Sequence, residues 1–161
     1  DLMAEAGLET LPEWGFACSP YLLGDETLLI EAGATFALDP ATGSVKWKGE
    51  RFTPAYGTPI AFTANGRKLI AVMKTEGLAV LEATNGKTVA TTPWKTSFDT
   101  TATTPIVQDG LIFISTGYDR GCALLELADG ELKKRYEHKA MCNHMNNSVL
   151  FDGHLYGFRS E

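Results

Sequence analysis

The sequence predicts an all-β protein made of repeated four-stranded antiparallel units, and three observations support this fold class. Glycines recur at a nearly constant spacing, short apolar segments alternate with turn residues inside each period, and no sustained helical periodicity follows the first dozen residues. Hydrophobic residues make up 44% of the 161 residues, which is enough to bury a sizeable core. We therefore expect short strands joined by tight turns, repeated along the chain.

Three series of glycines define the repeat. Gly33, Gly77 and Gly121 follow one another at intervals of 44 and 44 residues. Two further series keep nearly the same interval: Gly43, Gly86 and Gly130, and Gly66, Gly110 and Gly153. Because three independent series share one period, the chain is predicted to be a repeat protein.

Each unit contains four candidate strands in chain order, and the second unit shows them well. A proline-led apolar segment at 58–61 is followed by an Asn-Gly pair at 65–66, which is a strong hairpin signal. Apolar strands follow at 69–73 and 78–82, and a second glycine turn at 84–86 leads into the last strand. The unit therefore reads as four short strands joined by tight turns.

The first residues differ from the repeats. Leu2–Ala6, stopped by Gly7, predicts one or two helical turns within a connector at 1–15. The units then occupy approximately these ranges: 16–49, 56–92, 101–137 and 144–161, the last of them incomplete.

Four-stranded units of this length are the blades of a β-propeller, whose apolar faces must be covered by neighbouring blades. A leucine-rich solenoid is excluded because its shorter repeat is absent, whereas a two-sheet sandwich remains an alternative. Dividing 161 residues by a period of about 44 predicts an arc of about three and a half blades from a larger propeller. We expect the chain to be a fragment, and a self-associating half-propeller is the alternative.

The bulk composition narrows the classes of partner. Fourteen Lys and Arg against 20 Asp and Glu leave a net charge of −6, which argues against nucleic acid. No apolar run approaches the roughly 20 residues that span a bilayer, and no signal peptide is visible. The three cysteines are too few and too scattered for a disulfide-stapled scaffold, so their redox state stays open.

One turn carries a distinctive pattern. Residues 37–47 read apolar-x-Asp-x-x-Thr-Gly-x-x-x-Trp. Asp39 and Thr42 can hydrogen-bond the turn backbone, and Gly43 accepts the left-handed conformation. Trp47 can pack flat between adjacent blades, so we expect it to dock them and to be largely buried.

This pattern resembles the signature of the pyrroloquinoline-quinone-like (PQQ-like) propeller repeat. The later copies are degenerate: Ala90 and Lys134 stand where the Trp is expected. The chain is similar to bacterial PQQ-binding-like repeat proteins and to the branch that includes the outer-membrane assembly lipoprotein. The resemblance implies a closed propeller, commonly of eight blades, in the periplasm or elsewhere outside the cytoplasm.

The resemblance also implies two functions. The first is a non-catalytic interaction or ligand-binding scaffold in the bacterial envelope, which would bind a protein, a small molecule or a glycan and contact the remaining blades of its propeller. The alternative is a quinoprotein dehydrogenase that holds PQQ with Ca²⁺ mainly in blades outside this chain. The sequence has no adjacent Cys pair and no Cys-x-x-Cys-His haem site, so we favour a protein that is not an enzyme.

Candidate ligand-binding residues precede the proline-led strands, which we expect to line the central channel. Each of these loops carries an aromatic or His side chain with small polar neighbours, and together they could form a shallow polar funnel. The channel-facing candidates are Tyr56, Asp99, Asn143, His144 and Asn146. The alternative is that these groups satisfy the loop backbone.

Neither a catalytic residue nor a metal site is assigned. Cys142 and His144 share a face if their segment is extended, but they supply two of the three or four ligands that a metal needs. Asp99 is the only plausible carboxylate partner for His144. Tyr118, Asp119 and Arg120 read as a solvated turn.

Overall fold

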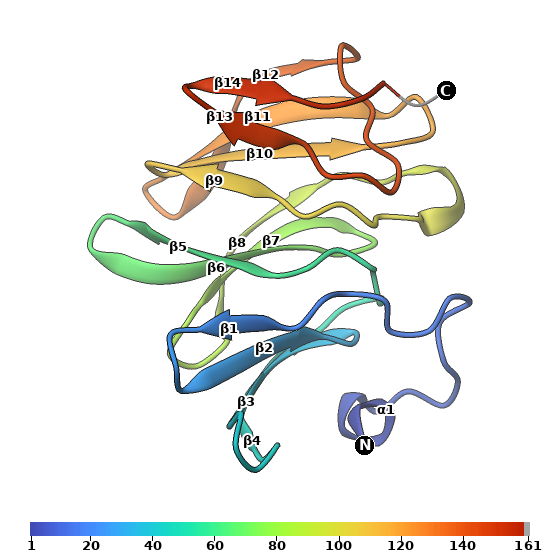
Figure 1. The fold of residues 1–161 in the computed structure, drawn as a ribbon, viewed down its shortest axis with the longest axis vertical. Coiled ribbons are helices and arrows are strands. Elements are labelled where there is room, and N and C mark those ends of the chain that lie inside the picture. The colour runs from blue at the N-terminus through green and yellow to red at the C-terminus, as the bar shows by residue number, and fades with distance from the viewer. Residues whose placement is uncertain (160–161) are drawn as a thin grey trace.

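A computed structural model describes residues 1–159; Ser160 and Glu161, where the fourth predicted unit ends, lie outside the described residues. The architecture is all-β, with three four-stranded antiparallel sheets and one two-stranded sheet (Figure 1). Apart from the strands, the chain forms a short helix α1 (Leu2–Ala6) and a 3₁₀ turn η1 (Ser97–Asp99). Asp1 caps α1 and Gly7 ends it with a φ of 67°, which confirms the helix predicted there.

The sheets follow the predicted units. Blade 1 consists of β1 (Tyr21–Leu23), β2 (Thr27–Glu31), β3 (Ala34–Leu38) and β4 (Val45–Arg51). Blade 2 consists of β5 (Ile60–Ala64), β6 (Arg67–Met73), β7 (Gly77–Glu82) and β8 (Thr88–Pro93). Blade 3 consists of β9 (Ile106–Gln108), β10 (Leu111–Thr116), β11 (Gly121–Ala128) and β12 (Glu131–His138). Partial blade 4 consists of β13 (Val149–Phe151) and β14 (His154–Tyr156).

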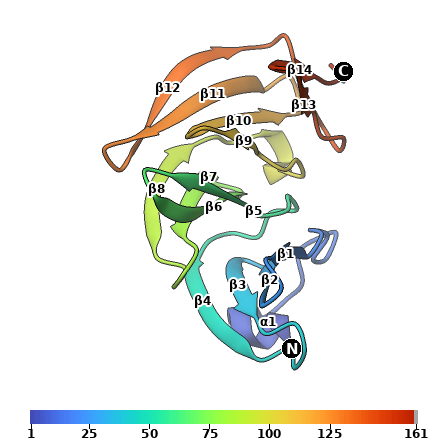
Figure 2. The ribbon, with the colours of Figure 1, turned by 60° about the vertical axis from the view of Figure 1, so that its left-hand side comes forward.

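Within each blade, strands that are consecutive in the chain are also neighbours in the sheet. Figure 2 shows β1, β5, β9 and β13 along one side of the arc, and β4, β8 and β12 along the other. The predicted Asn-Gly and Asp-Gly hairpins join the first two strands of blades 2, 3 and 4. Asn65, Asp109 and Asp152 adopt φ values of 51°, 50° and 47°, as such turns require.

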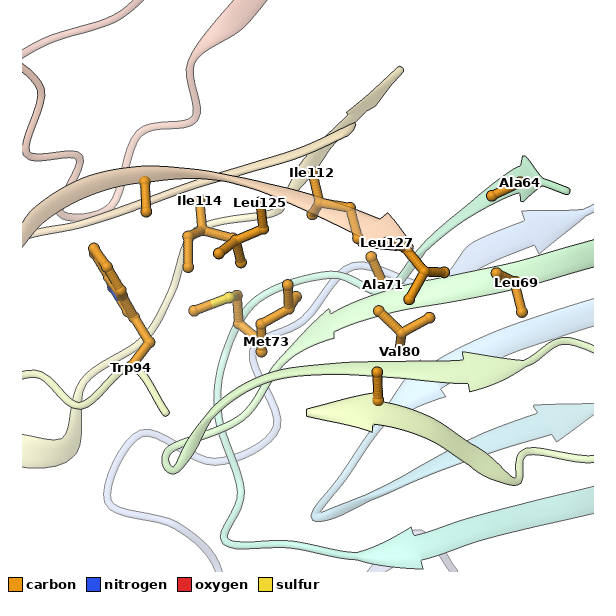
Figure 3. Close-up of a cluster of buried hydrophobic side chains, with 13 residues drawn as sticks. Ala64, Leu69, Ala71, Met73, Val80, Trp94, Ile112, Ile114, Leu125 and Leu127 are labelled. Atoms are coloured by element: carbon orange, nitrogen blue, oxygen red, sulfur yellow. The ribbon is translucent and has the colours of Figure 1, made fainter. Parts of the chain in front are cut away.

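Buried apolar side chains lie between the blades. The largest cluster joins blades 2 and 3, where Met73 and Val80 face Ile114 and Leu125 (Figure 3). A second cluster joins blades 1 and 2, and a third lies between blade 1 and α1. Each blade thus depends on its neighbours for burial, as expected of a repeat architecture.

The two ends of the arc differ. Ala6 of α1 packs with Phe36 and Leu38, so the helix covers blade 1. On partial blade 4, Val149 and Phe151 are exposed. Within residues 1–159 no helix is long and apolar enough to span a bilayer.

The turn that carries the PQQ-like pattern has the expected local geometry. The Asp39 carboxylate accepts hydrogen bonds from the Thr42 and Ala41 amides, both at 2.9 Å, and these bonds with the Thr42 hydroxyl lower the pKa of Asp39. Trp47 Nε1 donates to Ala83 O of blade 2 at 3.2 Å. The Trp47 side chain is partly buried and packs against the apolar cluster between blades 1 and 2, and part of it stays exposed because β4 is the edge strand of its sheet.

Candidate functional site

The segments that lead into β1, β5, β9 and β13 all lie at the same end of the blades, on the right in Figure 1. The β2–β3, β6–β7 and β10–β11 turns lie at that end too, because each blade is an antiparallel meander. We call this the loop end. Its side chains come from all four blades, so a ligand bound there would contact several repeats at once.

A row of aromatic side chains runs along the loop end. Trp14 and Tyr56 meet edge to face, with ring centroids 5.5 Å apart. Phe98 and Tyr118 are 5.1 Å apart, and Tyr118 and His144 are 4.5 Å apart. Trp14, Phe98 and Tyr118 remain 52%, 78% and 38% exposed. These five side chains form the aromatic row.

A hollow of about 390 Å³ joins the two halves of the row. Trp14 and Tyr56 line it together with Phe98 and Asp99. The remaining lining residues are aliphatic, Thr or Pro, together with Glu13. Its walls therefore carry three aromatic rings and two carboxylates, without a Lys, Arg or His among the described lining residues.

The two acidic residues that line the hollow, Glu13 and Asp99, have no counter-ion in the part of the chain that the structure describes. Among the described residues, the side chains of Glu13 and Asp99 form neither a hydrogen bond nor an ion pair. Burial raises the pKa of Tyr56, the Trp14 backbone amide opposes this, and the negative charge of Glu13 adds to the rise. The hollow is thus lined by two acidic residues beside the exposed rings of Trp14 and Phe98.

The backbone at Phe98 and Asp99 is unusual. Both residues adopt left-handed conformations, with φ of 63° and 51°. This conformation is an outlier for a bulky aromatic residue and costs on the order of 1–3 kcal/mol. The loop is held by Thr96, whose hydroxyl donates to Thr100 O at 2.8 Å. Because Phe98 is largely exposed, burial of its side chain does not compensate for the strain, and such strain is typical of functional loops.

The structure separates the five predicted channel residues into groups. Tyr56 and Asp99 line the hollow. Asn143 is buried; its amide nitrogen Nδ2 donates to Ser148 Oγ, while its backbone N–H donates to Ser115 Oγ at 3.0 Å.

His144 lies against Tyr118 in the aromatic row, and its Nε2 is buried without a hydrogen-bond partner in the described residues. Asn146 is exposed. A pairing of His144 with Asp99 is not among the hydrogen bonds or ion pairs of the described residues.

Sequence reasoning missed Glu13 and treated Tyr118 as part of a solvated turn. Tyr118 is instead the ring that connects Phe98 to His144. A signal was present in the sequence, because Glu13 directly precedes Trp14 and both stand before the first proline-led strand. Glu13 and Tyr118 are far apart in the sequence, and only the folded structure brings both to the loop end.

The described residues do not fit a Ca²⁺-bound quinone. Calcium takes six to eight oxygen ligands, as a rule including several carboxylates. Within residues 1–159 no three His, Cys, Asp or Glu side chains lie together in a way that could hold a metal ion. The buried Glu31 carboxylate is already engaged by Lys74, Thr35 and the Gly33 amide.

Comparison with solved structures identifies the fold. The chain is similar to BamB from Moraxella catarrhalis, with 18% identity and a TM-score of 0.54 over 82% of this chain and 40% of BamB. The chain has a β-propeller fold. It is also similar to the computationally designed protein Ika8, with 10% identity and a TM-score of 0.61 over 86% of this chain and 41% of Ika8. The chain thus spans about two fifths of the length of each of these two proteins.

At these identities the likeness concerns the fold alone. No family model and no curated protein sequence matches the chain.

Proposed function

We propose that this chain is part of a non-catalytic propeller that acts as an interaction scaffold in the bacterial envelope, with the loop end as its binding surface. The aromatic row is the observation that carries the proposal. Exposed aromatic side chains gathered at one place are typical of binding surfaces, because they offer large rigid contact area at low entropic cost. On this chain the row draws on loops of successive blades.

The chemistry at the loop end favours binding over catalysis. Within residues 1–159 His144 has no carboxylate partner that could orient it as a base. The cysteines Cys18 and Cys122 are not activated as nucleophiles, since burial raises the pKa of both thiols. The envelope location and the protein partner rest on the PQQ-like pattern at 37–47 and on the likeness to BamB.

Site-specific photocrosslinking in cells tests this function. A photoreactive phenylalanine analogue at Tyr118 reports on the loop end, and the same analogue at the exposed Val45 on β4 serves as the control. We expect a specific crosslink to one envelope protein from position 118, lost on Phe98→Ala, and none from position 45. Equal crosslinking from both positions, or dye reduction by the full protein with added PQQ and Ca²⁺, would refute the scaffold function.

A further inference from the structure

We propose that the hollow between Trp14, Tyr56, Phe98 and Asp99 binds the side chain of an arginine in an extended segment of a protein partner. The inference rests on the proposed function, and it names the chemistry of the partner. Its basis is a set of ring faces and carboxylates that the described part of the chain leaves without a cation.

The hollow combines the two kinds of group that recognise an organic cation. Aromatic faces carry a negative quadrupole that attracts a cation within about 6 Å of the ring centroid. Carboxylates add charge-assisted hydrogen bonds, which are shorter and stronger than neutral ones. Trp14 and Phe98 supply exposed rings, and Glu13 and Asp99 supply the carboxylates.

Elsewhere in the protein, aromatic rings and carboxylates of this kind are in contact with Arg and Lys side chains. The Arg120 guanidinium lies 3.4 Å from the centroid of the Trp94 ring. The Asp119 carboxylate, close in sequence to Tyr118 in the aromatic row, pairs with Lys139. The hollow has the same groups, but residues 1–159 supply no cation to it, so a cation from a partner would complete it.

Arginine fits this hollow better than lysine. A guanidinium is planar and weakly hydrated, so it can stack on a ring while its N–H groups bind a carboxylate in a two-pronged fashion. The left-handed backbone at Phe98 and Asp99 places an exposed ring and a carboxylate on adjacent residues of one loop. A single guanidinium could therefore contact both.

The aromatic row explains why the cation belongs to a polypeptide. One cation in an open hollow binds weakly, so a useful affinity needs further contacts. From Phe98 the row continues through Tyr118 to His144, which offers apolar area beside the hollow. A segment with an arginine in the hollow and apolar side chains along the row would use both features.

A peptide titration of the full protein tests the inference. The probe is acetyl-Gly-Arg-Gly-Leu-Gly-Phe-amide, and the matched peptide carries citrulline, which is neutral, in place of arginine. Trp14 is exposed and lines the hollow, so tryptophan fluorescence reports binding. We expect the arginine peptide to bind about tenfold more tightly than the citrulline peptide, with a difference that shrinks at high salt.

Two substitutions separate the charge from the fold. Asp99→Asn removes the carboxylate, and Asn tolerates the left-handed backbone. Asp109→Asn is the matched control, because Asp109 has a φ of 50° in the β9–β10 hairpin turn, at the opposite end of the blade. We expect Asp99→Asn to weaken arginine-peptide binding about five- to tenfold and Asp109→Asn to leave it unchanged.

Three results would overturn the inference. They are equal effects of Asp99→Asn and Asp109→Asn, equal binding of the two peptides, or tight binding of a neutral oligosaccharide such as chitohexaose with no response to the arginine peptide. The crosslink from position 118 distinguishes failure of the arginine site from failure of the scaffold function. If Asp99→Asn leaves that crosslink intact and the arginine peptide does not bind, the scaffold function stands and the cation site fails.

Discussion

The two interfaces between complete blades, which we call seams, both contain an apolar cluster but differ in their buried polar contacts. Between blades 1 and 2, Lys74 Nζ donates to Glu31 Oε2 and to Thr35 Oγ1, and the side chains of Lys74 and Glu31 are only 1% and 0% exposed. Between blades 2 and 3 an apolar cluster fills the seam, and Trp94 Nε1 donates to Thr116 Oγ1 at 2.8 Å.

This difference shows how a unit that lacks the expected Trp still packs against the next blade. In the first unit Trp47 bonds to the carbonyl of Ala83 in the next blade. In the second unit the same position is Ala90, and Trp94, just after β8, provides the ring that meets the next blade. The sequence period thus specifies the same strand pattern in each blade, whereas the residues that pack one blade against the next differ from interface to interface.

Breaking the buried ion pair between Lys74 and Glu31 should cause the largest loss of stability. Lys74→Met leaves the Glu31 carboxylate buried without its cation, and removing one partner of a buried pair costs about 3–5 kcal/mol of unfolding free energy. Urea denaturation measures the loss. Lys68→Met is the control, because Lys68 is an exposed lysine on β6, the strand that ends directly before Lys74.

A second variant checks the cause of that loss. Adding Glu31→Gln to Lys74→Met removes the unpaired charge and should restore part of the stability. Wild-type stability in Lys74→Met alone would mean that the pair does not hold blades 1 and 2 together.

The next largest loss of stability is expected at the interface between blades 2 and 3. Trp94→Ala removes a side chain that is 2% exposed, together with its hydrogen bond to Thr116 and its contact with Arg120, and we expect a loss of about 3 kcal/mol. Trp94→Phe keeps most of the apolar volume and should cost clearly less. Equal losses in the two variants would argue that the hydrogen bond, rather than packing, matters at this seam.

Trp47→Ala should cost less than Trp94→Ala, about 2 kcal/mol, because the Trp47 side chain is more exposed than that of Trp94. Gly86 sharpens the test, since a Cβ there would lie 2.5 Å from the Trp47 ring. Gly86→Ala should therefore be more harmful with Trp47 present than in the Trp47→Ala background, as a double-mutant cycle can measure. If the two changes in unfolding free energy simply add, Gly86 and the Trp47 ring are not in energetic contact.

The smallest expected effect is a pH dependence near the first seam. Burial opposes ionisation of Glu76, but the hydroxyl and amide of Thr53 bond to its carboxylate and lower its pKa below 4.5. A lowered folded-state pKa stabilises the protein above the unfolded value and loses that contribution as pH falls through the folded value. Glu76→Gln should therefore flatten the fall in melting temperature below about pH 4.5, whereas the exposed Glu131→Gln should not. Parallel curves for wild type and Glu76→Gln would contradict this.

Much of the fold follows from the sequence because its signals are local. The helix over Leu2–Ala6 and the hairpin turns at Asn65 and Asp109 depend on residues within a few positions of one another. The glycine period then shows how often the pattern recurs. These features predict the strands and their antiparallel order without any knowledge of how one blade faces the next.

Only the tertiary structure assembled the candidate site. Tyr56 and Asp99 were visible as loop residues, but their meeting with Glu13 and Trp14 in one hollow depends on how blades 1 to 3 pack. The same holds for the ion pair between Glu31 and Lys74, which are 43 residues apart in the chain. The physical reason is range: turns and strands are decided by neighbouring residues, whereas a surface shared by several blades is decided by the packing that sets their relative orientation.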